Sequence, residues 1–130
     1  SLLTSVAGAS QYFWGSVTSY DNSVKENVLG VPHEIIEQHG AVSQECVEAM
    51  ALGVNRVMNT DFAVATSGIA GPGGGSDEKP VGLVWIAVSS QMGTETFSLL
   101  SKGDRKRNID RFASNALNIL RKKIKNELSI

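Results

Sequence analysis

The sequence is poor in the features that mark secreted and membrane proteins. Its 130 residues include one cysteine, Cys46. A single thiol cannot close an internal disulfide, which favours a reducing, cytoplasmic compartment. The longest apolar run, residues 81–88, is far shorter than the ~20 residues of a membrane span. The first residues show no basic leader, so no signal peptide is expected.

Charge and histidine content narrow the function classes further. Charged residues make up 19% of the chain and the formal net charge is −1. No long-range attraction to nucleic acid or to an anionic membrane is therefore expected. His33 and His39 do not have the i, i+4 spacing of a helical metal pair, and no carboxylate pattern joins them. The sequence predicts no metal site, no other cofactor, no nucleic-acid partner and no membrane partner.

What the sequence does have is the composition of an ordinary globular domain. Apolar residues account for 42% of the chain, which is enough for a hydrophobic core. At this length a folded chain buries roughly two-thirds of the surface that it exposes when unfolded. We therefore expect one compact domain over residues 1–130.

Hydrophobic periodicity and turn residues predict the order of the elements. Apolar runs at residues 62–66 and 81–89 indicate fully buried strands, whereas residues 94–100 alternate. We also expect a strand at 11–20, helices at 22–29, 32–39 and 44–59, and a final helix with the apolar stripe Ile109, Phe112, Ala113, Ala116, Leu120 and Ile124. The expected N-caps are Asp21 or Asn22, Ser43 and Asp104.

The pattern of burial predicts the fold class. Strands in which apolar and polar residues do not alternate are buried on both faces of the sheet. The chain is therefore expected to be an α/β protein with a three-layer α/β/α sandwich. Trp14 and Trp85 are expected in its core. Cys46 falls on an apolar helix face and is expected to be buried and inert.

The most distinctive segment is a glycine-rich loop at residues 68–80, directly after a predicted strand. Glycines at a strand end let backbone N–H groups approach an anionic or carbonyl oxygen. The loop is neither a Walker loop nor a dinucleotide fingerprint, because Lys79 is misplaced for the first and no helix follows for the second. From these residues alone, a ligand-binding loop and a flexible connection both remain open.

Three further residues have a functional and a simpler interpretation. Lys25 follows a predicted strand and could act as a desolvated base, although a lone lysine on a short helix is typically a solvated charge. Arg105 at the head of the last helix suits phosphate or carboxylate binding, although an arginine in a charged run is more commonly solvated. Ser10 precedes a predicted strand, and its simpler interpretation is a turn serine.

Two stretches carry a resemblance to a known family. Residues 66–74 have the sequence Thr-Ser-Gly-Ile-Ala-Gly-Pro-Gly-Gly, and residues 78–85 have the sequence Glu-Lys-Pro-Val-Gly-Leu-Val-Trp. Together they resemble the signature loop and strand of CinA C-terminal domains. Tyr20, Asn22 and Lys25 are similar to the family's Tyr-Ser-Asn-x-x-Lys segment, and residues 29–31, 39–43 and 103–105 match in the same order. The resemblance spans essentially the whole chain.

The resemblance implies an activity and a set of site residues. Domains of this family hydrolyse the amide of nicotinamide mononucleotide to nicotinic acid mononucleotide and ammonia, without a metal, and usually form homodimers or higher homo-oligomers. Lys25 would be the base, Ser10 would lie close to the reacting amide, and Tyr20 would hold the substrate. Ser67 keeps the hydroxyl of the family's common threonine. Gly68, Gly71 and Gly73 would wrap the nucleotide, and Arg105 would meet its 5′-phosphate.

Two departures from the family pattern leave alternatives open. Family members carry a Glu-Ser-Cys-Thr-Gly-Gly segment upstream, whose serine is the implied nucleophile, and residues 1–4 resemble the tail of the helix that follows it. A protein without that segment is expected to be inactive. Residues 106–109, Lys-Arg-Asn-Ile, replace the family's common acidic-x-apolar-Arg pattern, so a second phosphate arginine is either missing or supplied by Arg107. The alternative function is a non-catalytic nucleotide-binding or oligomerisation module.

Overall fold

The computed structural model describes residues 2–129, so Ser1, at the start of the predicted helix tail, lies outside the described residues. The chain begins with two short 3₁₀ helices, η1 (Leu3–Ser5) and η2 (Ala9–Gln11). Three helices follow: α1 (Asn22–Asn27), α2 (His33–His39) and α3 (Gln44–Met58). The strands β1 (Phe62–Gly68), β2 (Leu83–Ser90) and β3 (Gly93–Leu100) come next, and α4 (Arg105–Leu128) ends the described chain.

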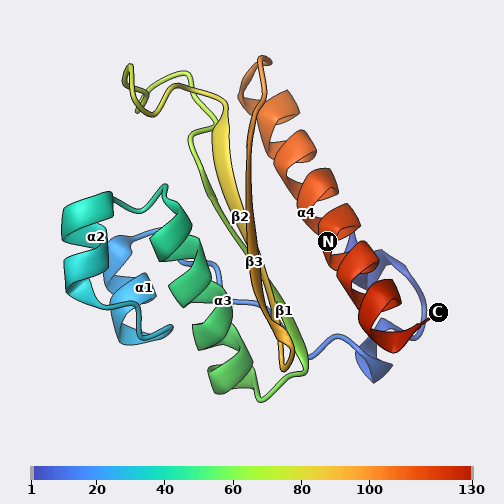
Figure 1. Ribbon diagram of the computed structural model, residues 1–130. Helices are drawn as coiled ribbons and strands as arrows, with labels where there is room; N and C mark the ends of the chain where they lie inside the picture. The colour runs from blue at the N-terminus through green and yellow to red at the C-terminus, as the bar shows by residue number, and fades with distance from the viewer. Residues whose placement is uncertain (1, 130) are drawn as a thin grey trace.

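The three strands form one antiparallel sheet in the order β1-β2-β3. In this register Val64 is opposite Val88, and Ile86 is opposite Phe97. β1 and β3 both end at the end of the sheet where β2 begins. The glycine-rich loop after β1 and the connection to α4 therefore leave the sheet at the same end (Figure 1).

Helices cover both faces of the sheet. α3, flanked by α1 and α2, packs on one face, and α4 packs on the other over β1 and β2 (Figure 1). The core on the α3 side consists of Leu29, Val31, Cys46, Val47, Met50, Ala51, Ala65 and Ala87. The core on the α4 side consists of Val84, Ile86, Val88, Phe112 and Ala116. The predicted three-layer α/β/α sandwich is confirmed.

The predicted N-caps form as expected. The Asp21 carboxylate accepts a hydrogen bond from the Ser23 N–H. Hydrogen bonding from the Ser23 hydroxyl and from this N–H lowers the pKa of Asp21. Ser43 Oγ accepts from the Cys46 N–H at 3.2 Å, and Asp104 Oδ1 accepts from the Arg107 N–H at 2.8 Å. Each cap satisfies a backbone donor that the first helical turn leaves free, and is typically worth about 1 kcal/mol.

The strand predicted at residues 11–20 is wrong. Residues 13–20 run as an extended segment whose side chains alternate between half-buried and exposed, but they form no sheet ladder. Val17 packs against the α3-side core. A cavity of about 1080 Å³, lined by residues 11–20 and 59–66 among others, lies between this segment and β1. A strand needs a hydrogen-bonding neighbour, and this segment and β1 line the cavity without pairing with each other.

Two side chains predicted in the apolar core are exposed. Trp14 is 61% exposed and Ile109 is 45% exposed. The buried residues of α4 are Asn108, Phe112, Ala116 and Lys123, so the buried stripe passes beside Ile109. Trp85 packs against the α3-side core and Cys46 is fully buried within it, as predicted.

Candidate functional site

The glycine-rich loop is held against the start of α4 by side chains of that helix. Arg105 Nη1 donates to the carbonyl oxygen of Gly71 at 2.9 Å. Asn108 Nδ2 donates to the carbonyl oxygen of Ala70, also at 2.9 Å. The predicted loop and the predicted arginine are therefore neighbours, and the loop is not simply a flexible connection. Arg105 is exposed to solvent apart from this contact, so its remaining N–H groups can face a ligand.

Asn108 is the residue of this region that the sequence patterns missed. Its side chain is fully buried, and besides holding Ala70 it accepts a hydrogen bond from the Gly103 N–H at 3.0 Å. A signal was present in the sequence: Asn108 lies four residues before Phe112 and eight before Ala116. A polar residue within a buried stripe needs partners there, and the adjoining loop supplies them.

The far end of the loop is held by the opposite layer of the fold. Lys79 Nζ donates to the carbonyl oxygen of His39 at the end of α2. Lys79 also lies close enough to α3 to act, together with Lys25, on the charge of the Cys46 thiol. Burial raises the pKa of Cys46, and the positive charges of Lys25 and Lys79 offset part of that rise. The loop therefore spans from α4 to the junction of α2 and α3.

Lys25 is buried, which corrects the interpretation of a solvated surface charge. Its side chain is 6% exposed, and its Nζ donates to the carbonyl oxygen of Ser19 at 2.7 Å. No carboxylate within residues 2–129 forms an ion pair with it. A buried amine without a carboxylate partner is the form in which lysines serve as bases in enzymes.

Tyr20 and Ser67 belong to two other segments of the chain. Tyr20 directly precedes the N-cap of α1 and is 88% exposed, so its hydroxyl faces solvent. Ser67 is half-buried near the end of β1, opposite Trp85, on the face of the sheet that α3 covers. Gly68 ends the same strand. These residues share the α3 side of the fold with Lys25, whereas Arg105 belongs to the α4 side.

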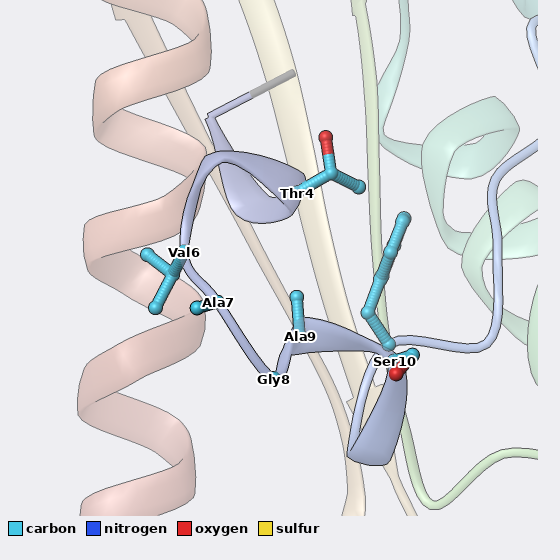
Figure 2. A pocket seen from close by; sticks show the side chains of 7 residues that line it. Thr4, Val6, Ala7, Gly8, Ala9 and Ser10 are labelled. Carbon is cyan, nitrogen blue, oxygen red and sulfur yellow. The ribbon is translucent and has the colours of Figure 1, made fainter.

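Ser10 lies apart from the other predicted site residues. It belongs to η2 and lines a cavity of about 420 Å³ formed by Thr4, Val6, Ala7, Gly8, Ala9 and Phe13 (Figure 2). The N-terminal segment runs beside the C-terminal half of α4, at the end of the molecule opposite to the glycine-rich loop (Figure 1). The structure thus joins Gly71 to Arg105 and buries Lys25, but does not bring Ser10 to the loop.

The family model of the CinA C-terminal domain matches residues 1–124. This chain belongs to that family. It is 46% identical over 125 residues to a CinA-like protein of Crocosphaera subtropica, and 45% identical over 122 residues to a putative competence-damage inducible protein of Caldicellulosiruptor bescii. The two alignments cover 95% and 94% of this chain. The chain spans about 30% of the length of each of these relatives.

Solved structures of CinA-family proteins have the same fold. The competence damage-inducible protein A (ComA) of Klebsiella pneumoniae superposes with a TM-score of 0.89 at 34% identity, covering 94% of this chain and 76% of that one. The competence/damage inducible protein CihA of Agrobacterium tumefaciens superposes with a TM-score of 0.85 at 38% identity, covering 91% of this chain and 73% of that one.

The described part of this CinA domain has neither a cluster of metal ligands nor a membrane-spanning helix. Among residues 2–129, no group of three or more His, Cys, Asp or Glu side chains could hold a metal ion. No helix in the same part of the chain is long and apolar enough to cross a membrane.

Proposed function

We propose that this chain is the catalytic domain of an amidohydrolase that converts nicotinamide mononucleotide and water to nicotinic acid mononucleotide and ammonia. The observation that carries the proposal is the buried amine of Lys25, which is 6% exposed and held by the Ser19 carbonyl. The matching of Tyr20, Asn22 and Lys25 to the family's Tyr-Ser-Asn-x-x-Lys segment supports the same role. Cytoplasmic location and homo-oligomeric assembly belong to this proposal.

Amide hydrolysis sets the roles that the residues would fill. A hydroxyl oxygen attacks the amide carbon, and Lys25 takes its proton. A site for the oxyanion stabilises the tetrahedral intermediate, and the backbone of the glycine-rich loop binds the nucleotide. The proton then passes to the leaving nitrogen, which departs as ammonia, and water hydrolyses the acyl intermediate. The resemblance implies that the attacking hydroxyl belongs to a serine of the Glu-Ser-Cys-Thr-Gly-Gly segment, which these 130 residues do not contain.

Charge and geometry indicate which residues would contact the other parts of the substrate. Arg105 lies at the N-terminus of α4 with part of its guanidinium free, which suits the 5′-phosphate. Tyr20 offers an exposed ring and hydroxyl for the sugar or the pyridine. The side chain of Arg107 packs along Gly103. Arg107 would therefore have to move away from Gly103 to act as a second arginine for the phosphate.

The test measures ammonia release from nicotinamide mononucleotide by the full-length gene product and by its Lys25→Ala variant. We expect kcat of the variant to fall by about a thousandfold, the middle of the range for removing a general base. Lys102→Ala is the matched control, because Lys102 is exposed and lies outside the proposed site. Wild-type turnover in Lys25→Ala would exclude lysine as the base.

A second candidate is a nucleotide-binding module without catalysis. The clamp between Arg105, Asn108 and the loop supports it, because this clamp is complete without Lys25. The two candidates differ in one experiment. A nucleotide that raises the melting temperature of the full-length protein while no ammonia is released would favour the module over the enzyme.

A further inference from the structure

The buried amide of Asn108 has both of its polar groups engaged. Its Nδ2 donates to the Ala70 carbonyl at 2.9 Å, and its Oδ1 accepts from the Gly103 N–H at 3.0 Å. The side chain has no exposed surface. A buried amide whose donor and acceptor are both satisfied is locked in one orientation. Asn108 therefore ties the loop after β1 to the connection that precedes α4.

This tie decides where the loop directs its N–H groups. Peptide groups are planar, so turning the Ala70 carbonyl toward α4 turns the N–H of Gly71 the opposite way. None of the hydrogen bonds formed within residues 2–129 uses the N–H of Gly71, Gly73 or Gly74. The clamp thus turns the unpaired N–H of Gly71, a buried residue, to the side of the loop away from α4.

We infer that Asn108 is a positioning residue for nucleotide binding: it orients the peptide group between Ala70 and Gly71 so that the Gly71 N–H can donate to a substrate oxygen. The inference rests on the proposed function, because it deepens the account of the same site. Asn108 is fully buried and acts through the loop.

Two variants of the full-length protein separate positioning from other effects. Asn108→Leu removes both hydrogen bonds at similar volume, and we expect KM for nicotinamide mononucleotide to rise about tenfold while kcat stays within about threefold. Asn108→Asp keeps the acceptor for Gly103 but, when ionised, cannot donate to Ala70. We expect a similar rise in KM at pH 8.

The pH profile of Asn108→Asp supplies a rescue. A neutral carboxylic acid has one O–H donor and one acceptor oxygen, so it can make both bonds of asparagine. We expect the ratio of the variant's KM to that of the wild type, measured at the same pH, to fall toward one as the pH is lowered. Asn118→Asp on the same helix is the control, because Asn118 is exposed. Its KM ratio should stay near one at every pH.

The outcomes are decisive in both directions. An unchanged KM in Asn108→Leu overturns the inference. A rise in KM that occurs in Asn108→Asp but not in Asn108→Leu would indicate that the new carboxylate repels the phosphate. If Asn108→Leu does not fold, Asn108→Ala takes its place, because it also removes both hydrogen bonds and adds no charge.

A measurement without substrate separates this inference from the proposed function. If the wild type releases no ammonia, the proposed function fails, but the NMR signal of the Gly71 amide still reports the loop. A Gly71 signal that shifts in Asn108→Asp at pH 8 and returns at low pH supports the positioning role. A signal that does not move overturns it.

Discussion

The two ends of the sandwich are held in different ways. At the loop end, side chains from α4 and from the loop itself bond to backbone carbonyls of Ala70, Gly71 and His39. At the opposite end, the N-terminal segment is rich in aromatics that find little cover: Tyr12 is 62% exposed and Trp14 is 61% exposed. The glycine-rich segment is therefore the more constrained of the two, although its composition is the more flexible.

This difference shows that composition sets which conformations a segment can adopt, and that contacts with neighbouring elements decide which conformation it adopts. Aromatic and β-branched residues prefer strands because they pack well on a pleated surface. Residues 13–20 have such a composition but no pairing strand beside them. Glycines lose more backbone freedom on folding than other residues, and at the loop end hydrogen bonds from α4 offset that cost.

The largest effect should come from a pair of glycines with similar backbones. Gly82 has φ +97° and Gly8 has φ +87°, so alanine is strained at both. At Gly82 the new Cβ would also overlap the Ser101 carbonyl, whereas nothing lies within 4 Å of it at Gly8. We expect Gly82→Ala to lower the free energy of unfolding by about 3 kcal/mol and Gly8→Ala by about 1 kcal/mol. Urea denaturation measures both, and equal losses would contradict the comparison.

A smaller effect should come from the charges that hold the opposite end. Lys123 is 7% exposed and pairs with Glu127 at 2.9 Å, and Ser90 Oγ donates to the same carboxylate. The hydrogen bonds from Ser90 and Lys123 lower the pKa of Glu127. Burial alone would lower the pKa of Lys123, but its bonds to Glu127 and Glu95 outweigh this and raise it.

The sign of the pH dependence follows from these shifts. Glu127 contributes stability above the ordinary glutamate pKa of about 4.3, and this contribution is lost as the pH falls through its lowered pKa. We expect Glu127→Gln to lower the melting temperature at pH 7 and the gap from the wild type to shrink toward pH 3. Glu78→Gln, on the exposed loop, is the control and should show no such trend. A gap that is independent of pH would contradict an ionic role.

The smallest effect should come from the extended segment. Trp14 is 61% exposed, so Trp14→Ser should change the free energy of unfolding by no more than about 0.5 kcal/mol. Trp85→Ser is the matched change in the α3-side core, where we expect a loss of about 3 kcal/mol. Denaturant titration of the two variants gives the contrast directly. A loss above about 2 kcal/mol in Trp14→Ser would mean that the segment is packed.

Local signals predicted most of the fold. The caps at Ser43 and Asp104 depend on residues three positions apart, and the strands around the loop are continuous apolar runs. Local signals could not predict the burial of Lys25, because α1 has only six residues and the burial of this lysine depends on neighbouring segments. Asn108 was within reach, since it lies in register with Phe112, but its partners at Ala70 and Gly103 are tertiary.

The candidate site was predicted unevenly for the same reason. The approach of Arg105 to Gly71 follows from two elements that leave the sheet at one end, so sequence order and strand direction suffice to predict it. The place of Ser10 depends on how a segment without a pairing strand crosses the fold, and no periodicity encodes that path. Residues beside regular elements are thus predictable, and residues on unpaired segments are not.

The glycine-rich loop is attached at both of its ends to different layers of the sandwich. Arg105 and Asn108 hold its first residues on the α4 layer, and Lys79 holds its last on the carbonyl of His39 in the opposite layer. Because the loop is bonded to both layers, a sliding motion of one layer past the other would have to change the conformation of the loop. A ligand that stiffens the loop would therefore stiffen the whole sandwich, far beyond the residues that it touches.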